Sequence, residues 1–266
     1  MIEKPLPSND PRSVDDLVNC ALNESDDEAA WDAVCALHWR GSREVMRRAE
    51  TLCGSPCVKE RRLGANILGQ LGVPDSTFPV ECSKRLRSML KNAEEASVLQ
   101  AVLVGISHQN DAEAVPLVVE FSTHTDPDVR HAVVLALSGQ ETPVAIECLV
   151  SLSTDLDANV RDWATFALGT LIELDTPAIR DALADRLNDS DDGTRGEAFV
   201  GLARRKDERV IDALKKELSS DSVGALAVEA AEMIASNELV PHLVALRTWW
   251  DVDTELLEQA ILASQE

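Results

Sequence analysis

An internal repeat of about thirty residues constrains this chain more than any other feature of its sequence. The clearest copies share an acidic start, an Arg four residues later and an Ala- and Leu-rich continuation; they are Asp126–Gly139, Asp157–Thr170 and Asp191–Arg204. Weaker copies, aligned on the residue before this Arg, are anchored at Ala29, Glu60, Val98, Gly224 and Thr254. Such a period predicts an array in which similar units stack side by side.

Each copy has the apolar periodicity of an amphipathic helix. In one copy, Val160, Ala164, Ala167, Leu168 and Leu171 recur at helical spacing, which predicts one buried stripe. The aspartates before the copies supply side-chain oxygens for the free amides of a first helical turn. We therefore expect one helix for each copy.

A second amphipathic segment lies between successive copies. Two of these segments begin with Thr142-Pro143 and Thr176-Pro177, which pair an N-cap residue with a proline in the first turn. The unit is then a helix hairpin, and with an initial segment at residues 14–22 the chain holds eight of them. Because a hairpin buries both of its apolar stripes only by stacking, the predicted fold is all-α, a right-handed α-solenoid. We expect a single domain over residues 13–266, after a loose lead-in at residues 1–12.

The charge of the chain limits the partners that it can bind. Its 25 basic and 47 acidic side chains give a formal net charge of -22, and residues 91–175 hold only three basic side chains against 14 acidic ones. Nucleic-acid backbones and anionic lipid surfaces attract positive proteins, so neither is an expected partner. A basic protein is the partner that this charge favours, and we expect the free chain to be a monomer.

The cellular location follows from what the sequence lacks. The beginning of the chain shows no apolar signal segment, and the longest apolar run, near residues 101–106, is too short to span a bilayer. We therefore expect a cytoplasmic protein whose six cysteines are reduced thiols.

The repeat motif resembles HEAT repeats of the short, phycobilisome-lyase-like kind. The Asp, the Val-Arg pair and the following Ala-Leu are complete in the copies that begin at Asp126 and Asp157. Residues 160–210 are similar to the YibA-like group of bacterial HEAT-repeat proteins. This resemblance implies a non-enzymatic scaffold that binds a protein. Some members of the group are considered immunity proteins of Rhs-type toxins, so inhibition of a polymorphic toxin is the most concrete expectation.

In HEAT arrays the helix that carries the Val-Arg pair lines the concave face, and the resemblance implies the same here. The residues expected to contact a partner on this face are Asp162, Trp163, Phe166, Glu197, Arg204, Arg205 and His131. Trp and Arg dominate the binding energy of many interfaces, which favours this interpretation. Two alternatives stay open: Trp163 can fill a gap between repeats, and the basic pair at 204–205 can stabilise a helix C-terminus.

The arginine of each motif has an expected structural role. We predict that these arginines bond carboxylates and backbone groups of adjacent repeats, in a ladder that comprises Asp126, Arg130, Asp157, Arg161, Asp191 and Arg195. A separate basic stretch, at Arg40–Arg48 and Lys59–Arg62, is interpreted as a solvated face.

No motif in the chain indicates catalysis, a cofactor or a metal. The group Cys53, Cys57, Cys82 and His38 lacks the second close pair of ligands that a structural zinc site has. The glycines of Gly64–Gly72 lie within a helical pattern and are interpreted as packing residues. The alternatives to a protein-binding role are an enzyme on the same fold, such as a bilin lyase, or a regulatory scaffold. A DNA glycosylase needs a basic groove to bind DNA, and the net charge of -22 argues against such a groove.

Overall fold

The computed structural model describes residues 9–92 and 95–265, and every regular element in these two ranges is helical. The helices cluster into two compact units, unit 1 with residues 1–137 and unit 2 with residues 138–266. Unit 1 contains α1 (Val14–Asn23), α2 (Asp27–Arg40), α3 (Arg43–Cys53), α4 (Val58–Gly69), α5 (Pro79–Leu90), α6 (Ala96–Gln109), α7 (Val115–Val118) between the 3-10 turns η2 (Ala112–Ala114) and η3 (Val119–Phe121), and α8 (Pro127–Leu137). Unit 2 contains α9 (Pro143–Leu152), α10 (Ala158–Phe166), the π-helical turn η4 (Ala167–Leu171), α11 (Pro177–Asp185), α12 (Asp192–Arg204), α13 (Val210–Glu217), α14 (Ala225–Ile234), the 3-10 turn η5 (Asn237–Leu239), α15 (Val240–Leu246) and α16 (Thr254–Ala263).

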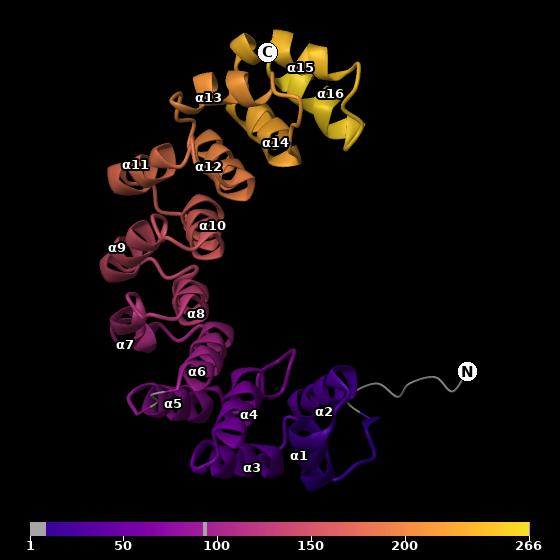
Figure 1. Cartoon of the computed structure of the whole chain (residues 1–266), viewed down its shortest axis with the longest axis vertical. Coiled ribbons are helices and arrows are strands. Elements are labelled where there is room, and N and C mark those ends of the chain that lie inside the picture. The colour runs from indigo at the N-terminus through magenta and orange to yellow at the C-terminus, as the bar shows by residue number, and fades with distance from the viewer. Residues whose placement is uncertain (1–8, 93–94, 266) are drawn as a thin grey trace, which may run out of the picture. The chain divides into compact units, whose positions relative to one another are not determined.

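Consecutive helices pair into hairpins, from α1 with α2 to α15 with α16, so the described residues form the eight hairpins that the repeat predicts. Within unit 1 the helices α2, α4, α6 and α8 pack side by side, and within unit 2 the same holds for α10, α12, α14 and α16 (Figure 1). The all-α solenoid expected from the repeat is therefore confirmed. No helix in the described part of the chain is both long and apolar enough to cross a bilayer.

The expected lead-in at residues 1–12 falls largely outside the described residues, since the description begins at residue 9. At residues 9–12, Asp10 and Arg12 form an ion pair of 2.6 Å. Arg40, at the end of α2, donates to the carbonyl oxygens of both residues, at 2.9 and 2.8 Å. The segment that enters α1 is thus bonded to the first hairpin.

Side-chain caps begin the helices where the sequence predicts them. Asp157 accepts hydrogen bonds from the first amides of α10, and Asp191 accepts one from the amide of Thr194 in α12. Thr142 and Thr176 cap α9 and α11, and a proline follows each of them. These oxygens satisfy amides that have no partner inside the helix.

The buried stripe of the α10 repeat departs from its prediction at the last residue. Val160, Ala164, Ala167 and Leu168 are fully buried, but Leu171 is 40% exposed. The cause is η4, whose wider turn closes with a bond from the amide of Ile172 to the carbonyl of Ala167. The extra residue in the turn moves Leu171 out of the stripe and places Ile172, which is 1% exposed, in the core.

Glycines allow neighbouring helices to approach backbone to backbone. A Cβ atom on Gly69 of α4 would lie 2.7 Å from the Cα of Gly105 in α6. A Cβ atom on Gly201 of α12 would lie at the same distance from the Cα of Gly169 in η4. The same device therefore joins successive repeats in both units, because any side chain at these positions would push the helices apart.

The arginine of the repeat motif bonds back to the loop before its own helix. Arg161 donates to the carbonyls of Asp155 and Leu156, and Arg130 donates to those of His124 and Thr125. Arg195 repeats the pattern with the carbonyl of Asp189. Each guanidinium thus fastens the turn that connects the two helices of a hairpin.

Two of these arginines, Arg161 and Arg195, also bind carboxylates of the following hairpin. Arg161 forms a two-pronged pair with Asp189 at 3.0 and 3.1 Å, and Arg195 lies 3.4 Å from Glu217. Asp157 and Asp191, which were expected among the rungs of this ladder, cap helices instead, and so does Asp126, which accepts from the amide of Asp128.

One arginine of the basic stretch belongs to the same series. Arg61 donates to the carbonyls of Ser55 and Pro56 and pairs with Glu95 at the start of α6. Its alignment with the motif, directly after the anchor residue Glu60, is the signal that distinguishes it from a solvated side chain.

We predict that Arg161→Ala lowers the free energy of unfolding by about 1–3 kcal/mol, because it removes both of its bonds to Asp189 and the donor of two loop carbonyls. The side chains of Arg161 and Asp189 are 13% and 6% exposed, so water replaces these bonds poorly. The measurement is thermal and urea unfolding followed by circular dichroism.

The matched control is Arg247→Ala, which removes an ion pair with Glu258 whose side chains are 47% and 56% exposed. Pairs this exposed contribute about 0–1 kcal/mol. Equal melting temperatures for the two variants would show that the Arg161 bonds do not hold the repeats together.

Candidate functional site

Three successive helices of unit 2 present the residues that the sequence expected on the binding face. Helix α12 packs against α10 on one side and α14 on the other. Residues at the same level of each helix are therefore neighbours in space. This brings Asp162 of α10, Glu197 of α12 and Glu229 of α14 into one row. The α10–α12–α14 face is defined here as this row together with Trp163 and Phe166.

The carboxylate of Asp162 is enclosed by the first turn of α12. A Cβ atom on Gly193 would lie 3.0 Å from the Oδ1 atom of Asp162, so a side chain there would press against that oxygen. Oδ1 is buried and accepts no hydrogen bond from the described residues. Burial, with a further contribution from the charge of Asp191, raises the pKa of Asp162.

Glu197 occupies the centre of the row, and its pKa is strongly shifted. Its burial, followed by the charges of Asp162 and Glu229, raises its pKa to about 7. None of the three carboxylates has an ion-pair partner among the described residues, whereas many of the arginines of unit 2 are paired elsewhere. The face therefore holds concentrated negative charge without a counter-charge.

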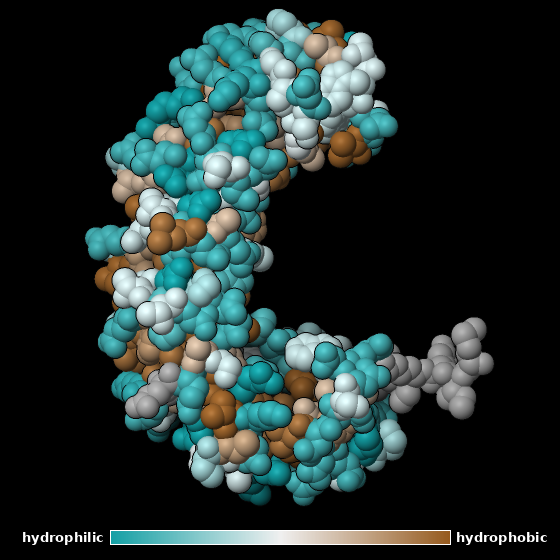
Figure 2. All heavy atoms as spheres, in the orientation of Figure 1, coloured by the Kyte–Doolittle hydropathy of each residue, from teal (hydrophilic) through white to brown (hydrophobic). Residues whose placement is uncertain are grey.

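An aromatic pair borders this charge. The rings of Trp163 and Phe166 meet edge to face, with centroids 5.7 Å apart and an interplanar angle of 87°. Trp163 is 36% exposed and Phe166 is half-buried, so the pair is partly open to solvent. In Figure 2 the visible surface is mostly hydrophilic, with hydrophobic side chains in separate spots. An exposed aromatic beside carboxylates suits a ligand with both apolar and cationic parts.

Arg204 and Arg205 are adjacent in sequence but differ in environment. Arg205 is 6% exposed and donates to the carbonyls of Leu168, Gly169, Ile172 and Leu174. It thereby satisfies carbonyl groups in η4 and just beyond it. This geometry favours a structural role for Arg205, and its contact with a partner stays a prediction.

Arg204 keeps an exposed side chain. It pairs with Glu173 at 2.7 Å and also donates to the carbonyl of Thr170. It therefore links the end of α12 to the end of η4, at a position that solvent still reaches.

His131, also expected on the face, lies on α8 in unit 1 and is half-buried there. The structure therefore groups Asp162, Trp163, Phe166 and Glu197 on the α10–α12–α14 face, and a contact of His131 with a partner stays a prediction. Glu229 was missed from the sequence. Its copy lacks the Arg, so its register was uncertain, although a carboxylate one repeat after Glu197 was the available signal.

The cysteines and histidines show no arrangement for chemistry. Among the described residues, no three His, Cys, Asp or Glu side chains are grouped so that they could hold a metal ion. Cys53 and Cys82 are buried, and burial raises the pKa of their thiols to about 11 and about 12. Both are therefore poor nucleophiles at neutral pH.

Comparisons with known proteins agree with the repeat architecture. The family model of HEAT repeats matches residues 83–169 and 149–235. Protein YibA of Escherichia coli strain K12 is 31% identical over 235 residues, which cover 85% of this chain and 81% of YibA. The X-ray structure of E. coli YibA superposes with a TM-score of 0.78 at 27% identity, over 96% of this chain and 93% of that one.

A crystal structure of an engineered protein shares the fold at a TM-score of 0.54 and 20% identity, over 95% of this chain and 77% of that one. The family model and the similarity to YibA each extend over more than half of the chain. The chain therefore belongs to the HEAT-repeat family, among the relatives of YibA.

Proposed function

We propose that this protein is a non-enzymatic scaffold that binds a basic protein through the α10–α12–α14 face of unit 2. One observation carries the proposal. Asp162, Glu197 and Glu229 share one row, and no cation of the described residues neutralises them. An Arg or Lys side chain of a partner would supply the missing donors and charge.

The charge of the protein would raise the association rate, and the buried contacts would lower the dissociation rate. The net charge of -22 would steer a basic partner to the protein and raise the association rate. Once the partner is in place, Trp163 and Phe166 offer an aromatic anchor next to the half-buried carboxylates. Anchors of this kind, surrounded by contacts that exclude water, slow dissociation.

The most specific form of the proposal is an immunity-type inhibitor of a polymorphic toxin, the role that the resemblance to YibA-like proteins implies. A basic nuclease domain would have the complementary charge, and occlusion of its surface needs no catalytic group on this chain. A cytoplasmic location belongs to the same proposal, and the free thiols of the cysteines are consistent with it.

The first prediction of this proposal concerns capture of the partner. Tagged protein should retain a basic protein from the native organism, and Trp163→Ala/Glu197→Ala should reduce that retention about tenfold or more, since it removes the anchor and the central carboxylate. Affinity purification with quantitative mass spectrometry measures both amounts. Co-expression then tests toxicity: the captured protein should arrest growth alone but not together with the wild-type chain.

Trp39→Ala/Glu44→Ala is the matched control, because both side chains are exposed and lie on unit 1. This variant should capture the partner as the wild type does. Equal capture by all three proteins would exclude the α10–α12–α14 face as the binding site. A captured protein that is harmless alone would refute the immunity role and leave the scaffold role.

A further prediction concerns pH. Because the pKa of Glu197 is raised from 4.5 to about 7, the folded protein binds more protons than the unfolded chain between these values, and stability falls as pH rises through this window. Glu197→Gln removes the charge that causes this loss. After a discount for the partial exposure of the side chain, the variant should gain about 1–2 kcal/mol over the wild type at pH 8.5 and little at pH 4.

Urea unfolding of both proteins at several pH values measures this difference. Asp162 and Glu229 are present in both proteins, so the difference isolates the ionisation of Glu197 within its row. If the wild type and Glu197→Gln differ in their free energy of unfolding by the same amount at pH 4 and pH 8.5, the assignment of a raised pKa to Glu197 is wrong.

A further inference from the structure

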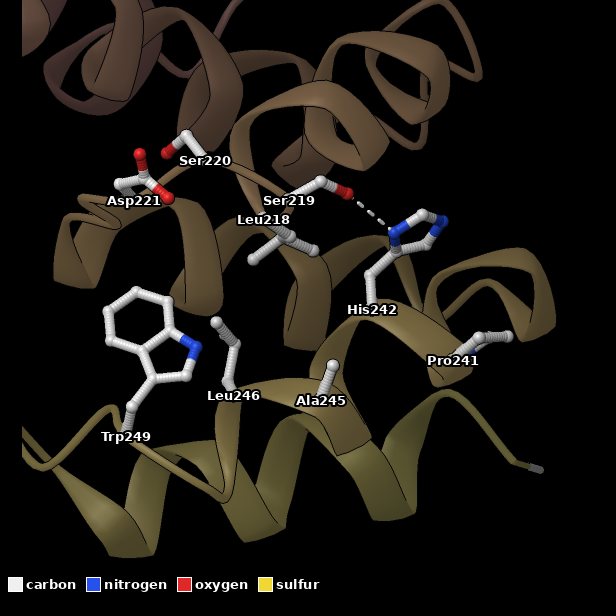
Figure 3. A pocket seen from close by; sticks show the side chains of 9 residues that line it. All are labelled: Leu218, Ser219, Ser220, Asp221, Pro241, His242, Ala245, Leu246 and Trp249. Atoms are coloured by element: carbon white, nitrogen blue, oxygen red, sulfur yellow. Dashed lines mark hydrogen bonds between the residues drawn. The ribbon is translucent and has the colours of Figure 1, made fainter.

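A pocket of about 480 Å³ lies between α13 and α15, away from the α10–α12–α14 face. Its lining residues come from the loop after α13, from α15 and from the turn after it; they are Leu218, Ser219, Ser220, Asp221, Pro241, His242, Ala245, Leu246 and Trp249. In Figure 3, Asp221 and Trp249 lie at one end, Ser219 and His242 at the other, and Leu218 and Leu246 between them. The volume is in the range of small-molecule sites.

The hydroxyl groups of Ser219 and Ser220 both donate their hydrogen to carbonyl oxygens of this chain. Ser219 Oγ donates to the carbonyl of Lys215 at 2.7 Å, so its contact of 2.8 Å with His242 Nδ1 requires the ring nitrogen to donate. The neutral His242 ring then keeps Nε2 as an acceptor. Ser220 Oγ likewise donates to the carbonyl of Ser222. These groups offer acceptors to a ligand, and they favour a ligand rich in donors.

The opposite end of the pocket favours positive charge. Asp221 is exposed and has no ion-pair partner among the described residues, and it follows the C-terminus of α13, where the helix dipole is negative. Lys215, whose carbonyl accepts from Ser219, has its ammonium group held by Asp212 and Glu238. An incoming cation would therefore meet a carboxylate that no described side chain neutralises.

Trp249 supplies an aromatic surface at the same end. The sequence predicts that Trp249 and Trp250 both cap the last hydrophobic face. Trp250 does so: it is 4% exposed, and its indole donates to the carbonyl of Val223 at 2.8 Å. Trp249 is instead 47% exposed and lines the pocket. A cation over an indole ring gains electrostatic attraction in addition to the carboxylate.

We propose that this pocket binds an organic cation, an alkyl chain that ends in a guanidinium or ammonium group. The cationic head lies between Asp221 and Trp249, and the chain lies along Leu218 and Leu246. A polar group at the far end reaches Ser219 and His242. The site is independent of the proposed binding face, because it uses other helices and other residues.

The test is a titration of the full-length protein with butylguanidinium, monitored by the indole N–H signals in ¹H–¹⁵N NMR. The Trp249 signal, assigned by its loss in Trp249→Phe, should shift and saturate at millimolar concentrations. Butylurea has nearly the same shape but no charge, so it should bind about tenfold more weakly or not at all.

Asp221→Asn should weaken butylguanidinium binding about tenfold while keeping the shape of the side chain. Asp251→Asn is the matched control, since it removes the same charge from an exposed residue outside the pocket lining. Equal binding of butylurea and butylguanidinium, equal effects of the two Asn variants, or no shift at about 50 mM ligand would each overturn the proposal.

Two further probes distinguish the source of the cation. Agmatine represents a free metabolite-like ligand, and an acetylated Gly-Arg-Gly amide represents an arginine side chain of a peptide. Tighter binding of agmatine assigns the pocket to small molecules, and tighter binding of the peptide assigns it to a protein segment. Either result retains the cation site, and loss of both with Asp221→Asn confirms the carboxylate as its centre.

Discussion

The packing of each hairpin against the next is the interaction on which the rest of this structure depends. A hairpin of two amphipathic helices has an apolar stripe that its own helices cannot cover, and only an adjacent hairpin of similar shape can bury it. The glycine contacts show how close this packing is. Where Gly69 meets Gly105, and where Gly169 meets Gly201, helix backbones touch without an intervening side chain. The repeat of about thirty residues is the sequence record of this requirement.

Polar bonds then fix the position of one hairpin on the next. Arg161 and Arg195 fasten the turn of their own hairpin and reach a carboxylate of the following one, so one side chain orients two hairpins. Arg205 donates to carbonyl groups of the π-helical turn in the preceding repeat, which would otherwise lack donors. The guanidinium groups of these arginines are occupied by bonds within the fold. The net charge is negative because 47 acidic side chains outnumber 25 basic ones.

The proposed function rests on the carboxylates that the packing leaves without a counter-charge. In unit 2, stacking brings Asp162, Glu197 and Glu229 together on adjacent helices, although they are more than thirty residues apart in the chain. Folding therefore creates the burial and the repulsion that raise the pKa of Glu197, and a basic partner would relieve the repulsion. The pocket beside Trp249 arises differently, from a turn in which one of two adjacent tryptophans enters the core and the other stays exposed.

The sequence by itself determined the helices, their caps and the stacking of hairpins, because these depend on local periodicity and on side chains within a few residues of the backbone groups that they satisfy. It also indicated Asp162, Trp163, Phe166 and Glu197, through the resemblance to HEAT arrays, in which the helix with the Val-Arg pair lines the concave face. The tertiary structure alone decided which arginines were free. Arg205 looks like a surface charge in the sequence, yet its donors are directed at carbonyl groups of a neighbouring repeat. It also decided that Leu171 is exposed and that Glu229 completes the acidic row, because a π-helical turn and the register of a degenerate repeat arise from contacts between helices, which local pattern does not encode.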